Sequence, residues 1–221
     1  MRTIRTLTTA FVFGAMLPSL AAAQRDRDFK DSWFWGIKAG GMSIPDSGGG
    51  WKQAPTVGGD WMITRTHGGV YMAASYTFFT QHTFMPVDPV TADSGFRPVK
   101  LKNLRHFEVL GVGFPGEYKR WHPYIAAGFG VSEISNVTAE GVFSSTDQLV
   151  FSQQLIDAGK VAFSPIVMGG AQYRLQKLSV FGQMSLGPGQ SNFLLNNGNS
   201  VNLTYEIGLR YNIGSAIEKD Y

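Results

Sequence analysis

The sequence has 221 residues and no cysteine. This absence excludes a disulfide scaffold, a zinc site with cysteine ligands and a cysteine nucleophile. Charged residues are also scarce: they make up 16% of the chain, compared with about 25% in average soluble domains. The length suits one domain, and the low charge indicates a surface unlike that of an ordinary soluble protein.

A long hydrophobic run is missing too. No apolar stretch after residue 23 reaches the roughly 18 residues that a membrane-spanning helix needs. Residues 1–23 carry Arg2 and Arg5, a largely apolar stretch from Leu7 to Leu20, and the small residues Ala21, Ala22 and Ala23 before Gln24, which predicts a cleaved signal peptide. An exported chain without a helical anchor is expected in the periplasm, in the medium or, as a β-barrel, in the outer membrane.

Positive charge is in only slight excess. The chain has 19 lysines and arginines against 16 acidic residues, and removing Arg2 and Arg5 with the signal peptide leaves 17 against 16, a net charge of +1. No basic cluster interleaved with aromatic residues is present. Nucleic acid is therefore excluded as a partner.

What the chain does contain is alternation. Its 27 glycines and its aromatic content of 13% suit short strands, and from residue 32 onward apolar and polar residues alternate with a period of two. This pattern predicts eight strands of about ten residues, the length that a tilted strand needs to cross a bilayer. They are Trp33–Met42, Thr56–Thr64, Val70–Thr80, Lys102–Phe114, Trp121–Ser132, Val161–Leu175, Leu178–Leu186 and Val201–Ile213.

The connections between these strands are alternately long and short. The long ones are Ser43–Pro55, Gln81–Leu101, Glu133–Lys160 and Gly187–Ser200, and the short ones are Arg65–Gly69, Pro115–Arg120 and Gln176–Lys177. Outer-membrane barrels have this layout, with short turns toward the periplasm and long loops outside. We therefore predict an all-β protein, an eight-stranded antiparallel up-and-down transmembrane β-barrel over residues 24–213 with a short periplasmic tail over 214–221. A helix over 148–157 is left open.

The charged residues of the strands share one face. They are Lys38, Asp60, Glu108, Arg174, Glu206 and Arg210, three of each sign. In a membrane barrel the lipid is the outer solvent, so charge must face the lumen. The interior of an eight-stranded barrel is just wide enough for side chains to fill it. We expect these six to pair inside as a closed, charge-balanced plug.

Aromatic residues stand at the ends of the apolar rows, where headgroup depth is expected. Trp33, Trp61, Phe114, Trp121, Tyr173 and Tyr211 form the predicted periplasmic girdle, and Tyr76, Phe78 and Phe163 the external one.

Three segments carry a family resemblance. Residues 122–131, HPYIAAGFGV, resemble the PY-x-G-x-G-x-G strand of OmpA-like and OmpW-like outer-membrane barrel domains, and 169–175, GGAQYRL, resemble the strand that follows it. Residues 206–213 resemble the terminal signal read by the barrel assembly machinery, with Ile213 in place of the usual phenylalanine. The resemblance implies the cell outer membrane as location and the assembly machinery as a partner during insertion.

Function is less determined than fold. We expect a monomer with a structural or surface-interaction role. The OmpW-like resemblance leaves open a narrow channel for small hydrophobic solutes. A soluble, lipocalin-like periplasmic carrier shares the strand number and alternation, and would turn the charged face outward.

Catalytic patterns are not found. None of His67, His82, His106 and His122 stands in the His-x-Ser pattern of lipid A deacylases. His106 and Glu108 share the inward face, but no nucleophile is expected beside them. Neither a metal-ligand spacing nor a phosphate-binding loop occurs, so no enzyme activity, cofactor or metal is predicted.

One binding site is suggested by basic residues near the external start of the fourth strand. They are Arg97, Lys100, Lys102 and Arg105, and Arg105 has outward parity. Phosphates of lipopolysaccharide lie at that height and attract arginine and lysine. We expect contact with outer-membrane lipid and lipopolysaccharide there.

Overall fold

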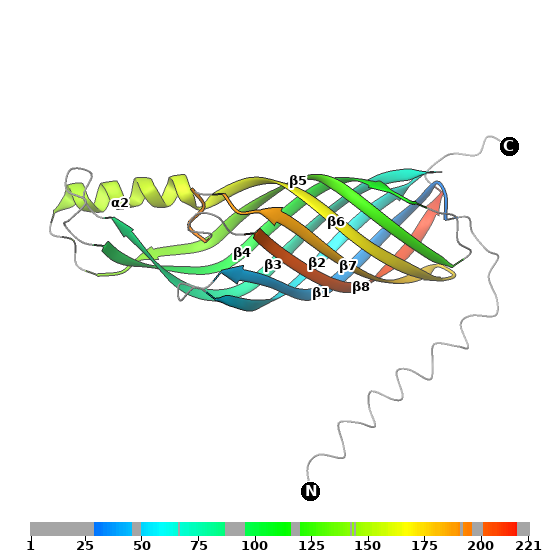
Figure 1. Cartoon of the computed structure of the whole chain (residues 1–221), viewed down its shortest axis with the longest axis horizontal. Helices are drawn as coiled ribbons and strands as arrows, with labels where there is room; N and C mark the ends of the chain where they lie inside the picture. Colours follow the sequence, from blue (N-terminus) through cyan, green and yellow to red (C-terminus); the bar gives the residue numbers. More distant parts are fainter. Residues whose placement is uncertain are drawn as a thin grey trace, which may run out of the picture.

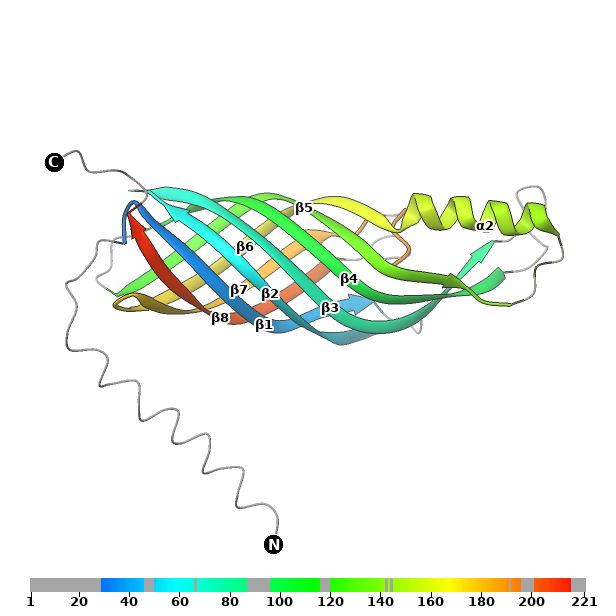
Figure 2. The same cartoon turned by 180° about the vertical axis from the view of Figure 1, so that it is seen from behind.

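The computed structural model describes residues 29–45, 50–65, 67–86, 96–115, 120–141, 143, 145–190, 192–195 and 201–215. Its elements are β1 (Ser32–Pro45), β2 (Trp51–Thr64), β3 (Gly68–Pro86), β4 (Phe96–Gly113), β5 (Trp121–Ala139), α2 (Thr146–Gly159), β6 (Val161–Leu175), β7 (Leu178–Pro188) and β8 (Val201–Ser215). Figures 1 and 2 show the strands wound around one axis, with α2 beyond one end.

The strands form one closed antiparallel barrel. Each strand pairs with its neighbours in sequence, and β8 pairs with β1. The predicted eight strands, their up-and-down order and their closure are thus confirmed. The connections β2–β3, β4–β5 and β6–β7 share one end, here the turn end, with the described chain termini; α2 lies at the other, the loop end (Figure 1).

Only part of the predicted domain boundaries falls on residues that the structure describes. Gly214 and Ser215, predicted to be tail, continue β8 and pair with β1. The predicted signal peptide and the rest of the tail lie outside the described residues.

Most strands are longer than predicted, whereas β6 has the predicted bounds. β3, β4 and β5 have 19, 18 and 19 residues, so large parts of the predicted external loops are strand. Ser43 pairs with Gln53, and Met85 with Arg97. The loop between β5 and β6 contains α2, whose first turn is capped by the Ser145 hydroxyl accepting from the Gln148 N–H. Beyond the barrel body, β3–β5 and α2 form an external lobe (Figure 2).

The alternation reverses where the lobe begins. Leu104 is buried and Arg105 exposed, yet beyond Asn103 the buried residues are Leu101 and Val99. Asn103 has a positive φ of 57°, a conformation that asparagine tolerates better than most residues, and the β3–β4 register shifts beside it. At this bulge β3 carries one residue more than β4, and the backbone turn at Asn103 directs Lys102 outward.

Apolar side chains fill both ends of the interior. The turn-end cluster comprises Phe29, Phe34, Met62, Tyr71, Ala73, Leu110, Val112, Tyr124, Ala126, Ile166 and Met168. The loop-end cluster comprises Met42, Ile44, Ala54, Phe79, Met85, Val99, Leu101, Leu104, Ile134, Ile156, Ala162, Phe193 and Leu195. Ile156 comes from α2, so the helix packs onto the interior of the lobe. Among the described residues, no helix is long and apolar enough to span a membrane.

Candidate functional site

The polar part of the interior lies between the two apolar clusters. Along β1 the inward residues run from Phe34 of the turn-end cluster, through Gly36, Lys38 and Gly40, to Met42 of the loop-end cluster. Gly36 pairs with Asp60 on one side and with Arg210 on the other. A Cβ at Gly36 would lie 2.6 Å from Asp60 Oδ1 and 2.8 Å from Arg210 Cγ. The glycine therefore makes the space in which these two side chains meet.

Arg210 is fully buried and has partners on all sides. Its Nε donates to Asp60 Oδ1 at 2.8 Å and its Nη2 to Asp60 Oδ2 at 3.4 Å. The remaining donors reach Gln172 Oε1 at 2.9 Å, Tyr124 Oη at 3.3 Å and Gln183 Oε1 at 3.0 Å. These bonds engage the guanidinium from several directions, in keeping with its five N–H donors. The guanidinium carbon, Cζ, of Arg210 also lies 3.7 Å from the ring centre of Phe181, which is close enough for a cation–π interaction.

Lys38 forms the second centre. Its ammonium group donates to Glu108 Oε1 at 3.1 Å, to Glu206 Oε2 at 2.9 Å and to Tyr71 Oη at 3.2 Å. These three contacts match the three donors of an ammonium group. Its cross-strand neighbours are Gly58 and Gly208, so the long side chain has room within the wall.

Gln183 joins the two centres. Its Nε2 donates to Glu206 Oε2 at 2.8 Å and to Tyr71 Oη at 2.9 Å, while its Oε1 accepts from Arg210. The result is one hydrogen-bonded layer that contains Asp60, Arg210, Gln183, Glu206, Lys38 and Glu108, here called the charged layer. A layer with all its members paired can be stable at low dielectric.

Five of the six predicted lumen charges meet in the charged layer. Arg174, the sixth, is also buried, but it lies two residues beyond Gln172 on the inward face of β6, nearer the turn end. The structure therefore places it at the edge of the predicted cluster.

His106 extends the charged layer toward β5. No nucleophilic side chain was expected beside His106, but the hydroxyl of Ser132 lies next to it. The Nε2 atom of His106 lies 3.7 Å from Glu108 Oε2, and its Nδ1 lies 2.8 Å from the hydroxyl of Ser132. The register could have indicated this, because Gly113 pairs with Ile125 across the β4–β5 turn and counting back sets Ser132 opposite His106. Ser132 is buried and Glu108 is shared with Lys38, so the arrangement holds His106 inside the wall.

The outer face has the opposite character. Ile37 and Ile207 are 69% and 71% exposed, whereas Arg210 is 0% exposed. At the turn end Trp33 packs against Trp61 and Trp121 against Tyr173, with ring centres 5.4 and 5.1 Å apart. The prediction for Phe114 was wrong: it packs edge-on against Phe29 at 5.0 Å and joins the turn-end cluster, because it follows the end of β4 and turns inward.

The predicted basic group at the loop end is spread over the outside of β4. Lys102 and Arg105 are exposed on the outer face. Lys100 lies 3.9 Å from Glu140, which also faces His82 at 3.6 Å. Arg97 lies further out in the lobe, opposite Met85. Only the inner part of the predicted group is therefore near the barrel wall.

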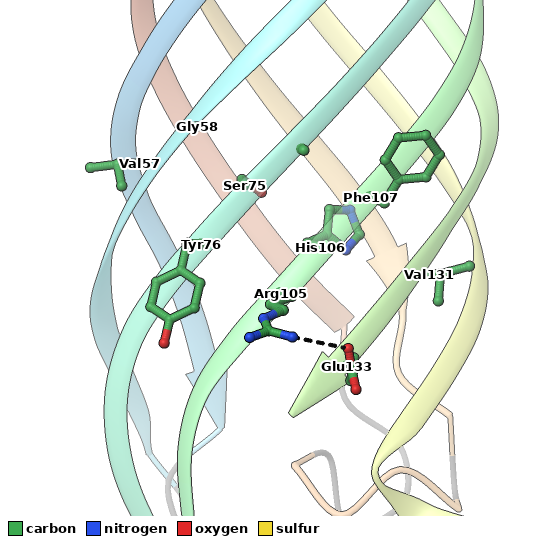
Figure 3. Close-up of a pocket in the computed structure, with 10 residues that line it drawn as sticks. Val57, Gly58, Ser75, Tyr76, Arg105, His106, Phe107, Val131 and Glu133 are labelled. Carbon is green, nitrogen blue, oxygen red and sulfur yellow. Dashed lines mark ion pairs between the residues drawn. The ribbon is translucent and has the colours of Figure 1, made fainter. Parts of the chain in front are cut away.

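A groove of about 540 Å³ lies in the wall beside Arg105 (Figure 3). It is lined by Val57, Gly58, Ala74, Ser75, Tyr76, Arg105, His106, Phe107, Val131 and Glu133. Arg105 and Glu133 face each other at one side of it, with Nη1 and Oε2 3.9 Å apart (Figure 3). Across the described ranges, no group of three or more metal-binding side chains gathers.

No protein-family model matches the chain, and no curated protein sequence matches it. Among solved structures, Neisserial surface protein A (NspA) aligns with a TM-score of 0.53 at 10% identity, over 81% of this chain and 96% of NspA. Ail of Yersinia pestis aligns with a TM-score of 0.48 at 9% identity, over 84% and 100%. OprG of Pseudomonas aeruginosa aligns at 0.46 and 13%, over 84% and 98%. The likeness to NspA shows the fold, which in this chain is a closed, eight-stranded antiparallel β-barrel.

Proposed function

We propose that the chain is an integral outer-membrane β-barrel with a closed, charge-balanced interior and a structural or surface-interaction role. The observation that carries this proposal is its inverted polarity. Large aliphatic side chains such as Ile37 and Ile207 cover the outside, while Lys38 and Arg210 are buried within. Such a surface is stable in lipid and unfavourable in water. The same observation argues against a soluble carrier.

The interior supports a barrel that does not conduct. The charged layer fills the middle, and an apolar cluster lies on either side of it. At the turn end Phe29 stacks on His122 with ring centres 3.8 Å apart, and at the loop end Ile156 of α2 is 4% exposed. An ion would have to displace packed side chains at three levels.

Surface interaction is assigned to the external lobe. It presents Phe84 and Phe96, each 63% exposed, on a sheet that continues beyond the barrel body. Directly after α2, the Lys160 ammonium donates to Asp157 at 2.8 Å. This hydrogen bond and the lysine's charge hold the pKa of the Asp157 carboxyl below its usual value. We assign the lobe no catalytic role, and the buried position of Ser132 supports a non-enzymatic protein.

The test of membrane insertion is the gel mobility of the protein in a purified outer-membrane fraction, with and without boiling. We expect a boiling-dependent shift in that fraction, because a folded barrel resists detergent until it is heated. Recovery as an unshifted, soluble periplasmic protein would instead identify a carrier.

The test of closure is conductance in a planar bilayer. We expect the purified barrel to be silent and Ile156→Asp, which places a charge in the loop-end cluster, to show openings. Val150→Asp is the matched control, since Val150 is 51% exposed on the same helix. Steady conductance, or uptake of small hydrophobic solutes by the unchanged protein, would support the channel alternative.

A further inference from the structure

The groove beside Arg105 combines an apolar floor with a charged edge. Val57, Ala74, Phe107 and Val131 line it on the outer face of β2–β5, and Tyr76 borders it. If the proposed outer-membrane location holds, this face meets lipid. An apolar furrow in that wall fits a hydrocarbon chain rather than a polar ligand.

The charged edge still has hydrogen-bonding capacity. Arg105 and Glu133 are 3.9 Å apart, which is attraction without a good hydrogen bond. The Arg105 side chain is 66% exposed, so its guanidinium is accessible from outside the barrel. Lys102 follows on the same outer face because of the bulge at Asn103, and it is exposed.

We infer that this groove binds an acyl chain of a phosphate-bearing outer-leaflet glycolipid, namely lipopolysaccharide, with its phosphate held by Arg105 and Lys102. The guanidinium provides paired donors for the phosphate oxygens, and the ammonium group adds a second positive charge. Among the described residues that line the groove, Glu133 is the one carboxylate. It orients Arg105 and lowers the affinity for an anion. Two cations against one carboxylate leave a net positive charge at the level where lipid phosphates lie.

The experiment is native mass spectrometry of the full mature chain in detergent micelles. It is titrated separately with lipopolysaccharide, with enzymatically dephosphorylated lipopolysaccharide and with phosphatidylglycerol. We expect the first to bind best, and Arg105→Gln combined with Lys102→Gln to weaken it about tenfold or more, since charge-assisted hydrogen bonds are lost.

A matched control removes the same charge elsewhere. Arg65→Gln combined with Lys30→Gln changes two exposed basic residues at the turn end, away from the groove. This variant should bind lipopolysaccharide as the unchanged protein does. An equal loss in both variants would show a net-charge effect and overturn the site.

A second pair of variants tests the apolar part. Ala74→Phe fills the groove, whereas Ala127→Phe makes the same change at another exposed alanine of the outer face, which does not line it. We expect only Ala74→Phe to weaken binding, by several-fold. Equal binding by both variants would overturn the acyl-chain assignment.

The lipid comparison decides the source of the ligand. Equal binding of dephosphorylated lipopolysaccharide would overturn phosphate recognition, and equal binding of phosphatidylglycerol would overturn the commitment to a glycolipid. The boiling-dependent gel shift is recorded for every variant. A barrel that shifts normally but does not discriminate these lipids contradicts only this inference, whereas loss of the shift in the unchanged protein contradicts the proposed function itself.

Discussion

Two arginine–carboxylate pairs lie on opposite sides of the same barrel wall. Arg210 and Asp60 meet inside at 2.8 Å with both side chains 0% exposed. Arg105 and Glu133 meet outside at 3.9 Å with side chains 66% and 46% exposed. The inner arginine has additional partners in Tyr124, Gln172 and Gln183, whereas the outer one borders an open groove.

The difference indicates a division of roles. A buried ion is stable only when its charge is paired and its donors are satisfied, and removing one partner leaves an uncompensated charge. An exposed pair contributes little to folding because water screens it. The inner pair is therefore structural, and the outer pair is available for binding.

The largest effect is expected at Lys38. Lys38→Met leaves the carboxylates of Glu108 and Glu206 without the ammonium group between them. Removing one partner of a buried pair costs about 3–5 kcal/mol. Because two carboxylates lose their partner here, we expect the free energy of unfolding to fall by at least the upper part of that range. Urea unfolding in lipid vesicles measures it. Adding Glu108→Gln and Glu206→Gln should recover much of the stability, and no recovery would contradict the electrostatic explanation.

Arg210→Met should follow closely. It leaves Asp60 buried with its main partner gone, and we expect a loss of about 3–5 kcal/mol in the free energy of unfolding. Asp60→Asn in the same chain tests the cause, since it removes the unpaired charge and should restore part of the loss. A single variant as stable as the unchanged barrel would show that the pair is dispensable.

Gly36→Val should have an intermediate effect without removing any charge. Its side chain would enter the space between Asp60 and Arg210, and overpacking of this kind costs about 1–3 kcal/mol. Gly169→Val is the control, because a Cβ at Gly169 meets nothing within 4 Å. If both variants unfold at the same urea concentration, the close fit around Gly36 has no energetic weight.

Much of the barrel could be predicted because the outer solvent enforces alternation. Each of the eight predicted strands overlaps one of the strands β1–β8. The charged residues predicted to share one face are buried on the inner face. Strand length could not be predicted, because exposed polar residues such as Thr80 and Lys102 interrupt the apolar row of the outer face and resemble loop residues. Pro86 and Pro98 also lie in strand, although proline is uncommon inside sheets.

The kinds of side chain inside the barrel could be predicted better than the partners with which they pair. Parity indicates that Lys38 and Glu108 point inward, but which carboxylate each cation meets depends on register across several strands. Gln183, which joins the two centres, carries no charge and gave no signal. The apolar clusters were missed because Phe34 and Met62 lie on the polar face of their strands, where a membrane barrel was expected to be charged.

The smallest effect on folding is expected at the outer pair, Arg105 and Glu133. A small effect there would strengthen the contrast with the inner pair, Arg210 and Asp60. Glu133→Gln removes a half-exposed carboxylate, and we expect the free energy of unfolding to change by less than about 1 kcal/mol. Its effect on binding should be opposite in sign to that of Arg105→Gln, because the groove edge gains net positive charge and lipopolysaccharide should bind a few-fold more tightly. Native mass spectrometry and urea unfolding of one preparation measure both quantities. A marked loss of stability would place Glu133 among the structural charges, and weaker binding would mean that its main effect is to orient Arg105 toward the phosphate.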